Sequence, residues 1–129
     1  HTAECIHGEK ISEGAISHLT PFLNHFMIIK DIDSRINIFD IKTLSTLGQL
    51  RNFEDVALVS SYSDKIIIAL NDGSILFYDF LTAEEIGRIN NKKSSPLSNL
   101  APINLMTEDD RLYAIFKEKI KIWTLPLLR

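Results

Sequence analysis

The feature that most constrains the fold is a short motif that occurs three times along the chain. In each copy an aliphatic residue, a variable residue and a second apolar residue precede an aromatic residue and a short polar one. The aromatic residues Phe39, Tyr78 and Trp123 are 39 and 45 residues apart. A period of about 40–45 residues is typical of a repeating unit of four strands. The chain is therefore predicted to contain about three such units. The copies are Arg35–Asp40, Ser74–Asp79 and Lys119–Thr124.

Each motif is predicted to lie in the third of four strands, named a to d. Short runs rich in Ile, Phe and Tyr that are bounded by turn-forming residues favour strand over helix. Asn71-Asp72-Gly73 precedes the second motif and is typical of a tight hairpin, because these residues tolerate a positive φ. The other predicted strands are Ile16–Leu19, Val56–Ser60 and Ile103–Met106 as strands a, Phe26–Ile29, Lys65–Leu70 and Arg111–Phe116 as strands b, and Leu47–Leu50 and Glu85–Ile89 as strands d.

This repeat resembles that of the WD-repeat β-propellers, in which strand c ends in Trp-Asp. Phe39-Asp40, Tyr78-Asp79 and Trp123-Thr124 are similar to that ending, and Asn71–Ile75 is similar to the family's Asp-Gly-Thr-Ile turn. The chain departs from the family pattern in two ways: no Gly-His pair precedes a strand a, and Thr124 stands where Asp is usual. The resemblance covers nearly the whole chain and implies an all-β fold of four-stranded antiparallel blades.

Three blades are fewer than the 4 to 8 that close a propeller, so the resemblance implies a partial propeller. One domain over residues 1–129 is expected, with blades at about 14–52, 53–91 and 99–129, and residues 1–8 as a strand of a neighbouring blade. Blades bury their apolar faces against their neighbours. Either the missing blades lie elsewhere in a longer chain, which the lack of an initiator Met favours, or copies of this chain associate.

The composition of the chain limits the partners and the cell compartment that are expected. Hydrophobic residues make up 45% and charged residues 24% of the chain, as in ordinary globular domains. A net charge of −3 does not favour binding to nucleic acid or to acidic membranes. Cys5 is the only cysteine, so no internal disulfide forms and a reducing compartment is favoured. An intracellular location, cytoplasmic or nuclear, is predicted.

The sequence contains no pattern typical of catalysis or of metal and cofactor binding. Cys5 and His7 are close, but His18 and His25 belong to other elements, so no metal-ligand set forms. The glycines are scattered and no Gly-x-Ser-x-Gly segment occurs. The chain is therefore predicted not to be an enzyme and to bind no cofactor.

Two groups of residues are candidates for binding a partner. Lys117, Lys119 and Lys121 alternate along the predicted strand c of the third unit, where they can face an acidic partner or a phosphate. The polar stretch 90–96 contains the second group and suggests a docking or phosphorylation loop. Solvated charge and a plain connector are the alternatives. The residues of the second group are Lys92, Lys93 and Ser95.

The aromatic residues Phe39, Phe77, Tyr78, Phe116 and Trp123 are expected to pack between blades. With no chemistry indicated, the favoured function is a non-catalytic scaffold or adaptor that holds protein partners, or the remaining blades, within a multi-subunit complex. The alternatives are a regulatory or structural propeller lobe of a larger enzyme chain, and nucleic-acid binding through the lysines.

Overall fold

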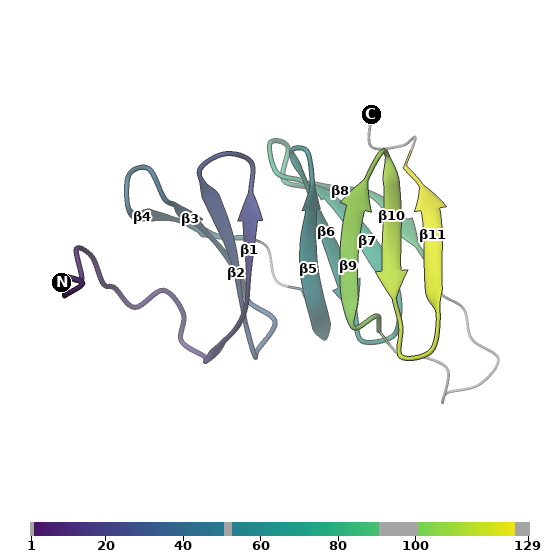
Figure 1. Ribbon diagram of the computed structural model, residues 1–129, viewed down its shortest axis with the longest axis horizontal. Helices are drawn as coiled ribbons and strands as arrows, with labels where there is room; N and C mark the ends of the chain where they lie inside the picture. The colour runs from purple at the N-terminus through teal and green to yellow at the C-terminus, as the bar shows by residue number, and fades with distance from the viewer. Residues whose placement is uncertain (1, 51–52, 91–100, 126–129) are drawn as a thin grey trace.

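The computed structural model of the protein describes residues 2–50, 53–90 and 101–125. These residues form eleven strands and no helix, arranged in three antiparallel sheets that follow chain order (Figure 1). The all-β prediction is confirmed. Sheet 1 contains β1 (Ile16–Phe22), β2 (Phe26–Asp31), β3 (Ile36–Asp40) and β4 (Ser45–Gln49). Sheet 2 contains β5 (Val56–Tyr62), β6 (Lys65–Leu70), β7 (Ile75–Asp79) and β8 (Glu84–Ile89), and sheet 3 contains β9 (Asn104–Glu108), β10 (Arg111–Ile115) and β11 (Ile120–Thr124).

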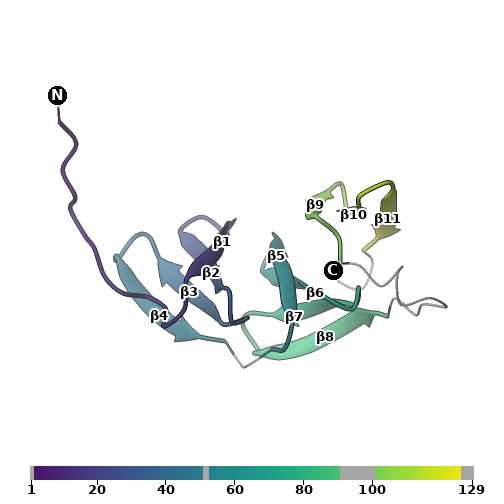
Figure 2. The same cartoon turned by 90° about the horizontal axis from the view of Figure 1, so that it is seen from below.

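The strands of each sheet pair in the order in which they occur in the chain. Figure 2 shows the three sheets following one another around an arc, with the N-terminal segment extending beyond sheet 1. Residues 2–15 form no strand. The assignment of residues 1–8 to a neighbouring blade, and the limits of the blades within a larger propeller, stay predictions.

Sheets 1 and 2 repeat one another in backbone detail at an offset of 39 residues. Both interrupt the pairing of their last two strands at the aromatic residue, between Ile38 and Phe39 and between Phe77 and Tyr78. The turn from β2 to β3 places Ser34 at φ 66°, where Gly73 has φ 93° in sheet 2. The sequence period therefore corresponds to a structural one.

The polar residue that ends the motif fixes the turn after strand c. Oδ1 of Asp40 accepts hydrogen bonds from the backbone N–H groups of Lys42 and Thr43, at 2.9 and 3.3 Å. Oδ1 of Asp79 accepts hydrogen bonds from the backbone N–H groups of Leu81 and Thr82, at 2.8 and 3.2 Å. A short carboxylate side chain can cap a turn in this way. Thr124 replaces this carboxylate in sheet 3.

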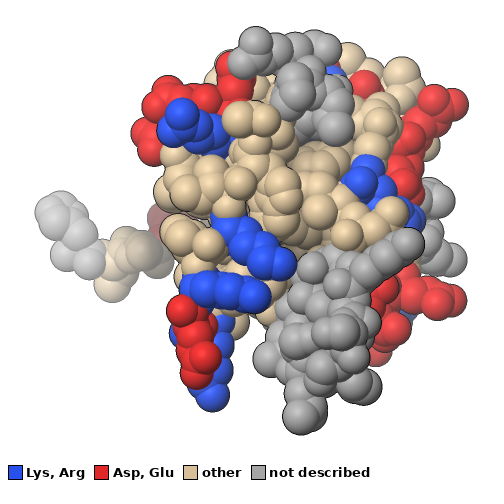
Figure 3. Space-filling view, turned by 90° about the vertical axis from the view of Figure 1, so that its right-hand side faces the viewer, with Lys and Arg blue, Asp and Glu red and all other residues tan. Residues whose placement is uncertain are grey.

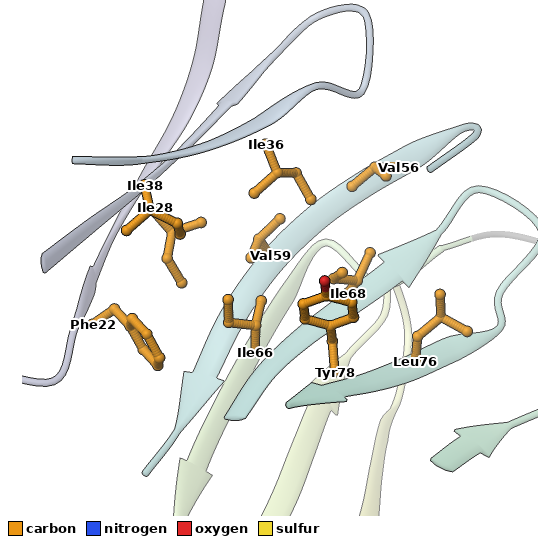
Figure 4. Close-up of a cluster of buried hydrophobic side chains, with 10 residues drawn as sticks. All are labelled: Phe22, Ile28, Ile36, Ile38, Val56, Val59, Ile66, Ile68, Leu76 and Tyr78. Atoms are coloured by element: carbon orange, nitrogen blue, oxygen red, sulfur yellow. The ribbon is translucent and has the colours of Figure 1, made fainter. Parts of the chain in front are cut away.

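The cores lie between the sheets, and sheet 2 is covered on both faces. Successive residues of a strand point to opposite faces, so a strand buried on both sides is apolar without alternation. Residues 66–69 and 75–78 are such runs, and every one of their side chains is buried. The first core lies between sheets 1 and 2 and includes Phe22, Val59 and Tyr78 (Figure 4). The second lies between sheets 2 and 3 and includes Phe77 and Leu112.

We call the side of a sheet that faces the next sheet its back face, and the opposite side its front face. Two contacts between first strands add to the apolar packing: the hydroxyl of Thr20 donates to the carbonyl of Val59, and that of Thr107 donates to the carbonyl of Ser61. The back faces contain Ile28, Ile36 and Ile38 in sheet 1 and Ile67, Ala69, Ile75 and Phe77 in sheet 2. The opposing front faces contain Ile66, Ile68, Leu76 and Tyr78 in sheet 2 and Leu105, Leu112, Ala114 and Trp123 in sheet 3.

The aromatic residues pack between the sheets with one exception. Phe77 and Tyr78 are buried, and Phe116 and Trp123 are partly buried against the second core. Phe39 instead lies on the front face of sheet 1, which no preceding sheet covers, and its ring centroid is 6.3 Å from that of His7. The prediction for Phe39 was wrong because the same position of the repeat faces a neighbour only where a sheet precedes it.

Ile67→Asp is expected to lower the free energy of unfolding by more than about 3 kcal/mol, because it buries a carboxylate without a partner between sheets 2 and 3. The side chain of Ile67 is 0% exposed. The measurement is urea denaturation followed by circular dichroism. Leu81→Asp is the matched control, since Leu81 lies in an exposed turn. Equal stability of the two variants would contradict the assigned core.

Candidate partner-binding surfaces

The back face of sheet 3 is an apolar surface that no described sheet covers. Tyr113 pairs with Met106 on one side and Ile122 on the other, and Ile115 pairs with Ile120. Directly paired residues of an antiparallel sheet point to the same face. The exposed fractions of Met106, Ile120 and Ile122 are 46%, 55% and 53%. Figure 3 views the molecule from the side of β11, where an uncharged area lies among basic and acidic side chains.

The repeat shows that this surface is of a kind that is normally buried. Ile120 occupies the position of Ile75 within the motif, and Ile122 that of Phe77. Both equivalents are buried against the next sheet, with 1% and 0% of the residue exposed. Contiguous exposed apolar surface on a protein marks a site of association. The back face of sheet 3 is therefore a candidate docking surface.

The outer edge of β11 is a second open feature of sheet 3. The N–H of Leu125 donates to Asp110 and the carbonyl of Lys119 accepts from Phe116, so these main-chain groups point toward β10. The N–H and C=O groups of successive residues point to opposite sides of a strand. Those of Ile120, Ile122 and Thr124 therefore point away from β10. Within residues 2–50, 53–90 and 101–125 no strand pairs with this edge. In sheet 1 the corresponding edge is paired with β4.

The sequence predicted that Lys117, Lys119 and Lys121 lie in one strand, but only one of them does. Lys117 and Lys119 lie in the exposed turn before β11, and only Lys121 belongs to the strand. The ammonium groups of Lys119 and Lys121 lie 5.9 and 5.5 Å from the ring centroid of Phe116, within the range of a cation–π contact. The three lysines therefore gather at one end of sheet 3 without forming a single row. Lys92, Lys93 and Ser95 lie outside the described residues.

The front face of sheet 1 is covered in part by residues 7–14, which we call the strap. The ring of His7 packs against Phe39, and Glu9 bonds to His7 at 2.8 Å and accepts from the hydroxyl of Thr46 at 3.3 Å. The exposed fraction of Ile29, in the middle of this face, is only 3%. A hollow of about 230 Å³ remains between the strap and the strands, lined by Lys10, Ile11, Ser12, Glu13, Arg35, Asn37 and Gln49.

Asp31 anchors the end of the strap to sheet 1. Its buried carboxylate accepts the hydroxyl of Ser12 at 2.5 Å and the backbone N–H groups of Asp33 and Arg35 at 2.8 and 3.0 Å. The guanidinium of Arg35 lies 3.0 Å from the same carboxylate. Burial raises the pKa of Asp31, but the hydrogen bonds and the charge of Arg35 outweigh it and hold the pKa below its ordinary value.

Next to Asp31, the side chain of Lys30 is also buried. Its ammonium group donates to the hydroxyl of Ser17 at 3.0 Å and to the carbonyl of Asp31 at 2.9 Å. Burial lowers the pKa of Lys30, against the opposing effect of the Asp31 charge. Burial, with a contribution from the nearby Lys30 charge, also lowers the pKa of His18. These groups have internal partners, so they fix the first strands of sheet 1.

The described part of the chain offers no metal centre, since nowhere in it do three His, Cys, Asp or Glu side chains gather. Cys5 is exposed, and its thiol donates to the carbonyl of His7 at 3.2 Å. A search of the same residues finds no helix that is long and apolar enough to cross a membrane.

Comparison with known proteins shows the fold of the chain but assigns the chain to no family. No family model and no curated protein matches the sequence. Among solved structures, BamB from Moraxella catarrhalis is 20% identical, with a TM-score of 0.64 over 83% of this chain and 30% of its own. The computationally designed protein Ika4 is 16% identical, with a TM-score of 0.75 over 96% of this chain and 74% of its own.

The β-propeller domain of Swd1 from Myceliophteria thermophila is 14% identical, with a TM-score of 0.54 over 90% of this chain and 40% of its own. The chain thus spans less than half the length of the two natural proteins. Together with the three sheets, these likenesses show a β-propeller fold of which this chain is a part. Sheets 1 to 3 each correspond to a blade of that fold.

The contribution of Asp31 to stability is expected to depend on pH. Because the folded pKa lies below the unfolded one, the ionised carboxylate stabilises the fold fully above the unfolded pKa, about 3.9, and loses this effect as the pH falls through the folded pKa. Asp31→Asn should therefore be less stable than wild type at pH 7, with a smaller difference at pH 3. Urea denaturation at both pH values measures this. A difference that does not change with pH would contradict the assigned network.

Proposed function

We propose that this chain is a non-catalytic protein-interaction segment of a β-propeller, and that it acts as a scaffold or adaptor within a multi-subunit complex. The observation that carries the proposal is the back face of sheet 3, where apolar side chains that are buried in the other two sheets are exposed. A protein surface whose equivalents are buried in both other repeats is suited to binding another protein.

The exposed lysines of sheet 3 lie at the end where β11 begins, beside this apolar surface, although Lys121 pairs with Ala114 and therefore points to the front face. Lys117 and Lys119 are exposed, and they border the turn that leads into β11. Interfaces commonly combine an apolar centre with a charged rim that steers the partner. The partner is therefore proposed to present acidic groups beside an apolar patch. The WD-repeat resemblance, an intracellular location and a docking role for Lys92, Lys93 and Ser95 belong to the same proposal.

Lys119→Glu is expected to weaken partner capture about tenfold, because it reverses the charge at the rim of the interface. The measurement is affinity capture from cells followed by quantitative mass spectrometry. Lys42→Glu is the matched control, since Lys42 is exposed in a turn of sheet 1 and undergoes the same change of charge.

The expected result is a defined set of proteins that wild type and Lys42→Glu retain and Lys119→Glu loses. Equal capture by both variants would remove the lysines from the interface. A wild-type chain that reproducibly captures no protein would contradict the scaffold function itself.

A further inference from the structure

The two ends of the stack of sheets differ in how they are covered. At one end the back face of sheet 3 is open, with Ile120 and Ile122 more than half exposed. At the other end the front face of sheet 1 is covered by the strap, so that Ile29 and Asn37 are buried although no sheet precedes them. Within the part of the chain that the structure describes, nothing covers the first face, whereas the strap covers the second.

The chain itself shows twice what covers a back face. The back face of sheet 1 packs against the front face of sheet 2, and the back face of sheet 2 against the front face of sheet 3. In both contacts a Thr hydroxyl also joins the first strands. The occupant that suits the back face of sheet 3 is therefore the front face of another such sheet. Within the described residues, the one front face that no sheet covers is that of sheet 1.

The strap covers that face incompletely. Apart from the ring contact of His7 with Phe39 and the bond from Ser12 to the buried Asp31, it is held by the bond between Glu9 and Thr46, which lies at the surface. On the same face Leu19, which pairs with Ile29, is 60% exposed. A packed sheet buries such a residue, because sheet-on-sheet contacts extend across all strands. The strap can therefore be replaced by a surface that covers more apolar area.

We propose that a second copy of this chain docks head to tail, with the front face of its sheet 1 on the back face of sheet 3, and that this docking displaces the strap. Contacts of this kind close into a ring when the rotation allows it and form filaments when it does not. Two copies contribute twice three sheets, which lies within the 4 to 8 blades of closed propellers. The strap then competes with self-association.

Gly14 allows the strap to be loosened without changing an apolar residue of either docking face. A Cβ atom there would lie 3.3 Å from Oδ2 of the buried Asp31 and 2.6 Å from Oδ2 of Asp33, whose exposed side chain can move. A Cβ at Gly8 would meet only the thiol of Cys5, at 3.8 Å. Gly14→Val should thus release the strap, and Gly8→Val is its matched control.

The experiment is sedimentation velocity of the purified chain over a range of concentrations, with circular dichroism on each variant. Wild type should convert from a monomer of 14.7 kDa to a dimer as concentration rises. Gly14→Val should shift this transition to about tenfold lower concentration, and Gly8→Val should not. Folded monomers of wild type and Gly14→Val at every concentration would overturn the proposal.

A mixing experiment tests the head-to-tail geometry. Ile122→Asp damages the back face of sheet 3 and Leu19→Asp the front face of sheet 1, both at exposed positions that the fold tolerates. Each variant alone should be monomeric, and an equimolar mixture should associate through the one intact pair of faces. Dimerisation of Leu19→Asp alone would overturn the geometry, because it would mean that two back faces meet.

The inference uses the same back face as the proposed function, and the two can fail separately. A monomeric chain that still captures partners in a Lys119-dependent manner overturns self-association only. A chain that dimerises as described but captures no other protein overturns the scaffold function only.

Discussion

The structure depends on one constraint: a sheet with two apolar faces is stable only if both are covered. Sheet 2 meets this condition fully, and its central strands are consequently the most apolar of the chain. Among the described sheets, sheets 1 and 3 each have one neighbouring sheet and one face that no sheet covers. The positions of the strap and of the exposed isoleucines of β11 both follow from this condition, and so do the candidate docking surfaces.

The uncovered face of sheet 3 has the properties of a protein-binding surface. Its most accessible groups are aliphatic side chains and the main-chain edge of β11, whereas the buried charged groups Asp31 and Lys30 have partners inside the chain. Apolar area that becomes buried provides the free energy of protein association. A partner that covers the face therefore completes the same packing that holds the three sheets together.

Much of the fold could be predicted from the sequence because the motif and its spacing report a repeated physical environment. The strands fell close to their predicted limits, and Asn71-Asp72-Gly73 formed the expected turn. Phe39 was misplaced because a repeat specifies which side a residue faces but not whether a neighbour is there. Lys117 and Lys119 were predicted in a strand, since alternation of lysines does not show where the strand begins. The strap has no periodicity, so no pattern indicated it.

One signal for the strap was nevertheless present in the difference between the repeats. Lys30 and Asp31 stand at the positions of Ala69 and Leu70 in sheet 2. A buried charged group costs free energy unless hydrogen bonds satisfy it. Its presence at the end of β2 therefore requires extra polar partners, and Ser12 of the strap supplies one of them. A charged departure from an apolar repeat position thus marks where a repeat is adapted to its own surroundings, here to the strap that lies over sheet 1.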